Sequence, residues 1–118
     1  MNGHVQNVEA LISGLAASVQ RFHERFGIVG PVTQAELLSR IPIQEEEVRE
    51  LQQAVLGEPP DNQAAEAVDV LYVAIGTVLR LDAELATRAI RQVIAKNDAK
   101  TLETHHVNAA GKVTKRKG

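Results

Sequence analysis

Apolar residues recur at spacings of three and four along most of the 118-residue chain, which is the period of an amphipathic α-helix. Glycine, proline and aspartate interrupt this pattern at intervals and divide it into separate segments. The segments predict four helices: Val5 to Phe26, about Ile43 to Leu56, from a cap at Asp61 or Asn62 to about Arg80, and from a cap at Asp82 to about Lys96.

The breaks between these segments have recognisable chemistry. Gly27, Gly30 and Pro31 favour a loop after the first helix. Thr33 is a suitable cap for a short helical turn through Leu38, and Pro42 is expected to begin the second helix, because proline is tolerated in a first turn. The segment GEPPD at 57–61 ends that helix.

The chain shows no internal repeat and no β-rich segment, and from about residue 97 it has no sustained period. Four helices with short connections predict an all-α four-helix bundle. A chain of this length fits one domain, so residues 1–118 are expected to form a single domain with an extended or partly ordered C-terminal tail.

Hydrophobic residues make up 44% of the chain but aromatic residues only 3%, so the core must be lean. Such a core favours added stability from self-association, and we expect a homodimer or a homotetramer. No apolar stretch approaches the roughly 20 residues of a membrane span. The first residues lack the basic start of a signal peptide, and cysteine is absent, so a cytoplasmic protein without a membrane partner is expected.

Charge is distributed unevenly. Lys112, Lys115, Arg116 and Lys117 lie in the last seven residues, and the rest of the chain has 9 basic against 15 acidic side chains. Two interpretations of the basic end stay open: it binds an anion such as phosphate, or it is a solvated terminus. No feature indicates binding to a nucleic acid polymer.

Acidic residues cluster on the second predicted helix. In IQEEEVREL, Glu46, Glu47 and Glu50 share one side of the helix, where they repel one another by roughly a few tenths of a kcal/mol even when exposed. Glu45 points about 100° away from Glu46 and is expected to be solvated. An ordinary solvated face beside Arg49 is the alternative for the whole cluster.

A second acidic pair lies on the third predicted helix, where Glu66 and Asp69 are three apart among apolar neighbours and burial is expected. No basic residue occurs from Gln63 to Thr77, so these carboxylates need a raised pKa, a distant cation or a metal. Oxygen ligands from two facing helices suit Mg²⁺ or Mn²⁺. A di-iron site would need a Glu-x-x-His pair, and neither helix contains histidine.

Together these segments resemble a known family. EEVRE at 46–50 and EAVD at 66–69 are similar to the EExxE and ExxD motifs of the MazG-like all-α nucleoside triphosphate pyrophosphohydrolases. VQRFHERFG resembles the helix before the first motif, and KNDAK followed by GKVTK resembles the C-terminal phosphate-contacting segment.

The resemblance implies Mg²⁺-dependent hydrolysis of a nucleoside triphosphate between its α and β phosphates, which gives the monophosphate and pyrophosphate. It implies that Glu47, Glu50, Glu66 and Asp69 are metal ligands. Glu46 would bind a second ion, or orient and deprotonate the attacking water. The residues expected to contact phosphate are Asn97, Lys100, Lys112 and Lys115.

Three functions follow as hypotheses. The leading one is the removal of non-standard or deoxy nucleoside triphosphates, including dUTP. Phosphoribosyl-ATP hydrolysis shares the chemistry, and a non-catalytic helical module that binds a basic partner is the third. His105 and His106 are expected to be surface residues, and Phe22, Phe26 and Tyr72 to pack in the core rather than to stack on a base.

Overall fold

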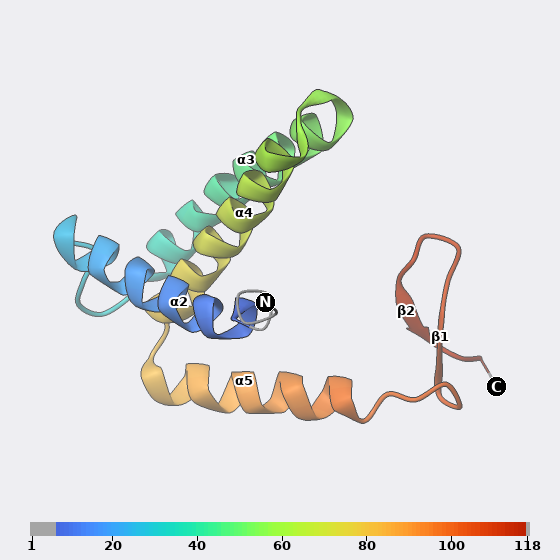
Figure 1. Cartoon of the computed structure of the whole chain (residues 1–118). Coiled ribbons are helices and arrows are strands. Elements are labelled where there is room, and N and C mark those ends of the chain that lie inside the picture. Colours follow the sequence, from blue (N-terminus) through green and yellow to red (C-terminus); the bar gives the residue numbers. More distant parts are fainter. Residues whose placement is uncertain (1–6, 118) are drawn as a thin grey trace. The chain divides into compact units, whose positions relative to one another are not determined.

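The computed structural model describes residues 7–117 and contains four helices and one small hairpin within that range (Figure 1). The elements are α2 (Val8–Arg25), α3 (Gln34–Gly57), α4 (Pro60–Arg80), α5 (Ala83–Asp98), β1 (His105–Val107) and β2 (Val113–Lys115). The prediction of an all-α fold with four helices is confirmed. Val5, the predicted start of the first helix, lies outside the described residues. Within 7–117, no helix is long and apolar enough to cross a bilayer.

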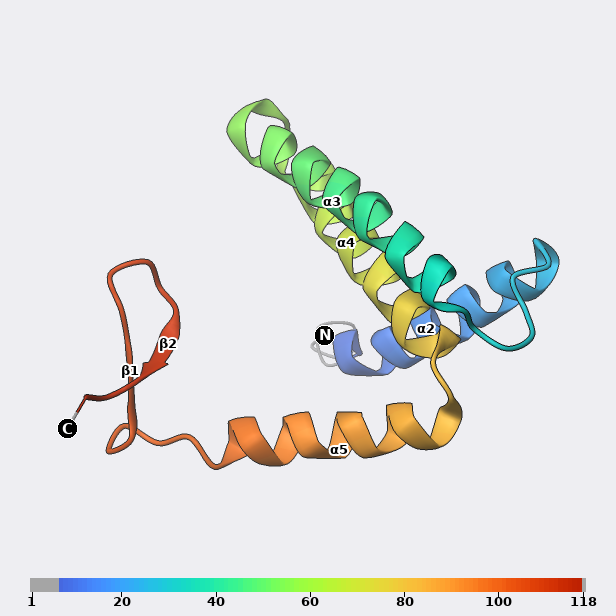
Figure 2. The same cartoon turned by 180° about the vertical axis from the view of Figure 1, so that it is seen from behind.

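The chain divides into two compact units, Met1–Asp82 and Ala83–Gly118. In the first unit α3 and α4 lie side by side along their length, as the two opposite views show (Figures 1 and 2), and α2 packs against α4. The core of this unit is as lean as the composition predicts, because the buried apolar side chains of the described residues are Val19 and Ala54.

The contact between α2 and α4 combines apolar and polar groups. Val19 of α2 is 1% exposed, and the hydroxyl groups of Ser18 and Tyr72 lie 3.4 Å apart. The ring of Phe22 meets Tyr72 edge-on with centroids 6.0 Å apart, and Phe26 lies 4.8 Å from Phe22. These three aromatic rings therefore lie against one another. Phe22 is 40% and Phe26 62% exposed, so the expectation that they belong to the core is wrong for these two residues.

Helix α3 differs from its prediction. Thr33 caps the helix, since its Oγ1 accepts a hydrogen bond from the Glu36 N–H at 3.1 Å, but the helix then continues through Pro42 to Gly57. A proline inside a helix removes one backbone hydrogen bond. Side chains on both sides of Pro42 bond to α4: Arg40 to Thr77 at 2.6 Å and Gln44 to the Val70 carbonyl at 3.0 Å. These tertiary contacts hold both parts of α3 on α4 and outweigh the local preference for a break.

The start of α4 also differs from its prediction. Pro60 occupies the first turn and the flanking residue Pro59 makes no side-chain cap. Proline has its φ fixed near the helical value and no N–H to satisfy, so it begins the helix before the predicted caps. Asn62 instead donates its side-chain amide to Glu58 Oε1 at 3.2 Å.

The second unit contains α5 and an antiparallel hairpin in which His106 pairs with Thr114. The predicted extended tail is thus partly a β-structure. Its turn depends on Asn108, whose Oδ1 accepts hydrogen bonds from the N–H groups of Ala110 and Lys112 at 2.9 Å, and on Gly111 at a φ of 84°.

Gly76 on α4 is the point of closest approach to both other helices of the first unit. A Cβ at this position would lie 2.6 Å from Arg40 Nη2 and 3.1 Å from His23 Nε2, so either the guanidinium or the imidazole must move. His23 is buried and the Nη2 group of Arg40 donates to the Val73 carbonyl at 2.9 Å, so both side chains are held in place.

Two glycine substitutions test this close approach. Gly14→Ala, in α2 with no atom within 4 Å of the new Cβ, should raise the free energy of unfolding by about 0.5–1 kcal/mol through helix propensity. In Gly76→Ala the clash should cancel the gain in helix propensity and break at least one hydrogen bond, which is worth about 0.5–1.5 kcal/mol. The free energy of unfolding of this variant should therefore be lower than that of the parent. Urea unfolding measures both, and equal stabilisation by the two alanines would contradict the predicted clash.

Candidate metal centre

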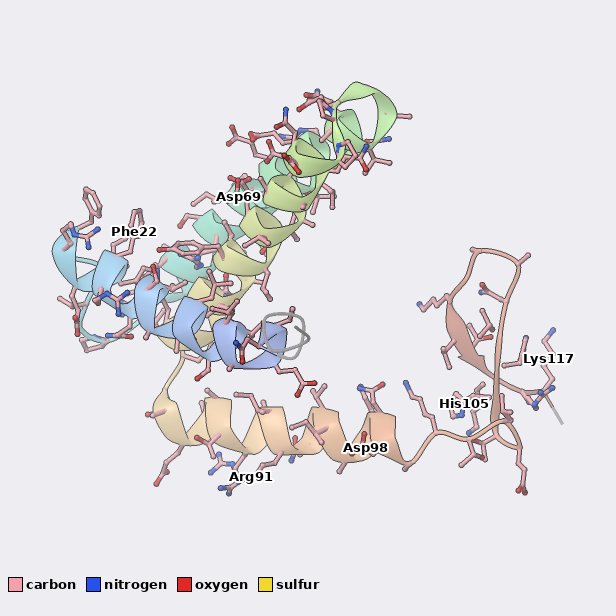
Figure 3. The ribbon with its side chains drawn as sticks, viewed as in Figure 1. Phe22, Asp69, Arg91, Asp98, His105 and Lys117 are labelled. Carbon is pink, nitrogen blue, oxygen red and sulfur yellow. The ribbon has the colours of Figure 1, made fainter. Side chains whose placement is uncertain are left out.

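Three carboxylates from two helices meet in the first unit. Glu47 projects from α3, and Glu66 and Asp69 project from α4 one turn apart. One carboxylate oxygen from each lies within 4.8 Å of the others. Figure 3 shows Asp69 on the part of α4 that runs beside α3. Glu66 and Asp69 share a face of α4, as predicted for residues three apart, and the packing of α3 on α4 brings Glu47 to them.

The carboxylates differ in their exposure. Glu47 and Glu66 are partly buried, whereas Asp69 is exposed, contrary to the expected burial of both acidic residues on that helix. Asp69 lies at the edge of the helix pair, with Val68 beside it 47% exposed. Glu47 Oε2 and Glu66 Oε1 are buried and have no hydrogen-bond partner among the described residues. Buried carboxylate oxygens without a donor are costly, and a bound cation would satisfy them.

The electrostatics of the cluster favour a bound cation or proton. Burial is the main cause that raises the pKa of Glu47, and repulsion from Glu50 and Asp69 adds to it. Burial is also the main cause that raises the pKa of Glu66, again with contributions from Glu50 and Asp69. Each of these carboxyl groups therefore holds its proton more tightly than an isolated glutamate does.

Glu50 and Glu46 lie at the margin of this cluster. Glu50 is partly buried and close enough to repel both Glu47 and Glu66, but it is not one of the three residues whose oxygens converge. Glu46 is exposed and makes the smallest contribution to the raised pKa of Glu47. Glu45 is exposed and contributes to neither pKa, in agreement with its predicted solvation.

The donor set fits a divalent cation that prefers oxygen. Three carboxylates without histidine or cysteine suit Mg²⁺ or Mn²⁺, which keep several waters when bound by few protein ligands. The two buried oxygens without partners are the observation that supports this fit.

The predicted phosphate contacts lie in the second unit and are not all together. Asn97 and Lys100 are adjacent, with Lys100 Nζ donating to Asn97 Oδ1 at 3.0 Å, and both line a cavity of about 470 Å³. Lys115 pairs with His105 across the hairpin and lines a different cavity of about 570 Å³. Lys112 lies in the hairpin turn and lines neither cavity.

His106 borders both of these cavities. It is partly buried and its Nδ1 is buried without a partner, so the prediction that it is a surface residue is wrong. In the hairpin His106 pairs with Thr114, and the sequence signal that could have shown this hairpin is the Asn-Ala-Ala-Gly turn between two short β-prone segments.

The raised pKa values predict how stability depends on pH when metal is removed by a chelator. A carboxyl group whose pKa is raised by folding stabilises the folded state when it is protonated. This contribution is complete at pH values below the pKa of the group in the unfolded chain, 4.5 for Glu47, and is lost as the pH rises through the pKa of the group in the folded state. Glu47→Gln removes this loss, so the variant should be more stable than the parent at pH 8 and should show no such gain below pH 4.5.

Glu45→Gln is the matched control on the same helix, and its stability should follow the parent at both pH values. Urea unfolding in chelator measures all three proteins. A Glu47→Gln variant less stable than the parent at pH 8, or an equal gain in Glu45→Gln, would contradict the repulsion in the cluster.

Comparison of the sequence with known protein families gives a match over the part of the chain that carries this cluster. The family model described as phosphoribosyl-ATP pyrophosphohydrolase matches residues 31–97, which is more than half of the chain and includes every carboxylate of the cluster. Comparisons with curated proteins and with solved structures gave no significant match. The matched range, the acidic motifs and the all-α fold agree, and the chain belongs to the phosphoribosyl-ATP pyrophosphohydrolase family, within the MazG-like all-α nucleoside triphosphate pyrophosphohydrolases.

Proposed function

We propose that this protein is a Mg²⁺-dependent pyrophosphohydrolase that cleaves a nucleoside triphosphate between its α and β phosphates. The leading substrates are non-standard or deoxy nucleoside triphosphates, including dUTP. The observation that carries the proposal is the convergence of Glu47, Glu66 and Asp69 with two buried oxygens that lack partners. The family match supports hydrolysis of a phosphoric anhydride but leaves the substrate open.

In this proposal Glu47, Glu50, Glu66 and Asp69 hold the divalent cation, with Mn²⁺ as an alternative to Mg²⁺. A bound Mg²⁺ would supply positive charge to the phosphate oxygens, which the acidic cluster alone would repel. The partial burial of Glu47 and Glu66 limits the access of water to their oxygens and strengthens their attraction for a cation.

Glu46 is proposed to act on the attacking water or to help hold a second ion. It is exposed on α3 next to Glu47, so its carboxylate is free to reach solvent. As a general base it would accept a proton while the water oxygen forms a bond to phosphorus and the bridging P–O bond breaks. The products are the nucleoside monophosphate and pyrophosphate.

The basic residues of the second unit are proposed to contact the substrate phosphates. Lys100, Lys112 and Lys115 supply cations, and Asn97 holds the Lys100 ammonium group at 3.0 Å. The proposal assigns the whole chain, residues 1–118, to one pyrophosphohydrolase domain, and places it in the cytoplasm with its nucleotide substrates.

Phosphoribosyl-ATP is the second candidate substrate, because it names the family model that matches residues 31–97. Its hydrolysis breaks the same kind of bond, and the same carboxylates would serve. A non-catalytic helical module is the outcome that remains if neither substrate is hydrolysed.

We also propose that the protein is a homodimer or a homotetramer. In the single chain many large apolar side chains are exposed, among them Leu11 at 66%, Leu38 at 64% and Leu56 at 78%, while few are buried. Association would cover such surface. Sedimentation equilibrium of the full chain measures the mass, and the mass of a single chain at micromolar concentration would contradict the proposal.

Pyrophosphate release from a panel of triphosphates, with phosphoribosyl-ATP included, tests the activity. Asp69→Asn should lower kcat/KM by at least about 100-fold, because the exposed Asp69 supports little of the fold while its charge is needed for the cation. Glu45→Gln should keep the parent activity. Release that is unchanged in Asp69→Asn and in Glu47→Ala would exclude this cluster as the metal site, and no release from any substrate would contradict the enzyme assignment.

A further inference from the structure

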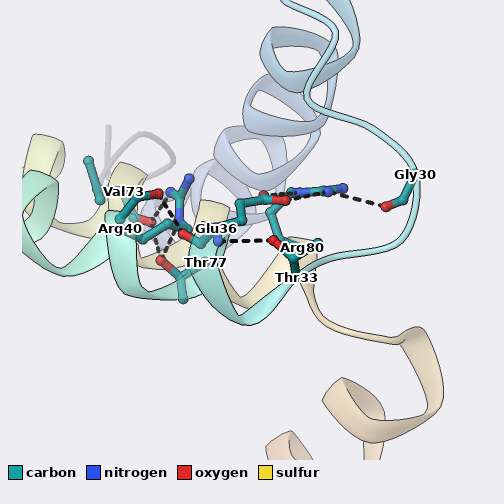
Figure 4. Close-up of polar contacts among 8 residues, drawn as sticks. Gly30, Thr33, Glu36, Arg40, Val73, Thr77 and Arg80 are labelled. Atoms are coloured by element: carbon teal, nitrogen blue, oxygen red, sulfur yellow. Dashed lines mark hydrogen bonds and ion pairs between the residues drawn. The ribbon is translucent and has the colours of Figure 1, made fainter.

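A second polar cluster in the first unit joins α3 to α4 (Figure 4). Arg40 of α3 donates from Nε to Thr77 Oγ1 at 2.6 Å and from Nη2 to the Val73 carbonyl at 2.9 Å. Arg80 of α4 donates to both carboxylate oxygens of Glu36, at 2.5 and 2.9 Å. The cluster thus contains two guanidinium groups and one carboxylate.

The charges of this cluster are not balanced. Glu36 is bonded to Arg80 through two hydrogen bonds, and the two acceptors of Arg40, the Thr77 hydroxyl and the Val73 carbonyl, are neutral oxygen atoms. The neighbouring imidazole of His23 is buried, and burial together with the nearby Arg40 lowers its pKa, so it is neutral at physiological pH. Two cations against one anion leave a net positive charge around a partly buried arginine, and such a charge attracts an anion.

Both arginines open onto one cavity. A pocket of about 380 Å³ is lined by Arg40, Arg80 and Glu36, by Ser39 and Ile43 of α3, and by residues 27–29 of the loop after α2. Gly76 leaves room for this arrangement, because any Cβ there would displace Arg40. The carbonyl of Gly30 also accepts a hydrogen bond from Arg80 at 3.1 Å and fixes the loop at the rim.

The pocket and the carboxylate cluster lie along the same side of α3. Arg40 precedes Glu47 by seven residues, which is two turns, so the two side chains differ by roughly 20° around the helix and by roughly 10 Å along its axis. On α4, Val73 and Glu66 are also seven residues apart. A ligand about the length of a nucleotide would span this distance.

We propose that Arg40 and Arg80 form a phosphate-binding site, separate from the carboxylate cluster, that takes one phosphate monoester or inorganic phosphate. Arginine presents planar donors that match phosphate oxygens. Glu36 neutralises one of the two guanidinium groups and so limits the site to a single anionic group. The bound group is either free inorganic phosphate or a phosphate of the substrate that is remote from the cleaved anhydride. Only the second case rests on the proposed function.

The first experiment is a titration with inorganic phosphate in chelator, followed by NMR through the side-chain Nε–Hε signals of the arginines. The signals of Arg40 and Arg80 should shift and saturate, and that of Arg49, which is exposed on α3, should not. Arg40→Gln should weaken saturation at Arg80 by at least about tenfold, while Arg49→Gln leaves it unchanged. Absent or unsaturable shifts at Arg40 and Arg80 would overturn the proposal.

A second pair of variants covers the case in which Arg40→Gln fails to fold. Ile43→Glu adds a carboxylate at the pocket, where Ile43 is 44% exposed, without removing any hydrogen bond of Arg40. It should weaken phosphate binding by at least about tenfold. Val55→Glu, which is 58% exposed on the same helix and outside the pocket, is its control. Equal phosphate binding in both variants would contradict the site.

Measurements of substrate hydrolysis distinguish the two sources of the phosphate. If the phosphate belongs to the substrate, Ile43→Glu should lower kcat/KM for phosphoribosyl-ATP by about tenfold relative to that for ATP. If the site takes free phosphate, this ratio should stay unchanged while the NMR titration still shows binding. A protein that hydrolyses neither of these compounds nor any other triphosphate of the panel would refute the proposed function, and the NMR titration would still decide the phosphate site.

Discussion

The carboxylates between α3 and α4 repel one another, and the other contacts of the first unit have to outweigh this repulsion. Glu47 faces Glu66 and Asp69 within 4.8 Å, and no hydrogen bond from the described residues reaches the buried oxygens of the two glutamates. In the absence of a cation this arrangement opposes the packing of the helix pair. Such strain at a site is usual where function, rather than stability, selects the residues.

The contacts that oppose this repulsion are mainly polar and lie towards one end of the helix pair. Gln44 bonds to the Val70 carbonyl, Arg40 to Thr77 and Val73, and Arg80 to Glu36. Because few apolar side chains of the described residues are buried, these directional bonds set the register of α3 against α4. The same register brings the carboxylates together and aligns Arg40 with them on one side of α3. One set of contacts therefore explains both the acidic cluster and the cationic pocket.

Much of this structure follows from local patterns. The period of three and four predicted the helices, and the spacing of Glu66 and Asp69 predicted that they share a face, because both depend on residues close in sequence. The approach of Glu47 to this pair depends on the packing of α3 on α4. The continuation of α3 through Pro42 was not predictable in this way, since it depends on partners in α4 more than 25 residues away. The position of Arg40 was not predictable for the same reason, because its partner Thr77 lies on α4. The partial burial of His106 depends on a hairpin that the helical period does not indicate. The exposure of Asp69 depends on the edge of the helix pair, which periodicity does not locate.

The binding of a divalent cation by Glu47, Glu66 and Asp69 is the central requirement of the proposed function. Calorimetric titration of the metal-free full chain with Mn²⁺ at a series of acidic pH values, repeated in buffers of different ionisation enthalpy, tests this directly. Since the pKa values of Glu47 and Glu66 are raised, binding should release protons, and it should be lost in Asp69→Asn but kept in Glu45→Gln. Saturable binding that persists unchanged in Asp69→Asn and in Glu47→Gln, or no binding by the parent protein, would contradict the account.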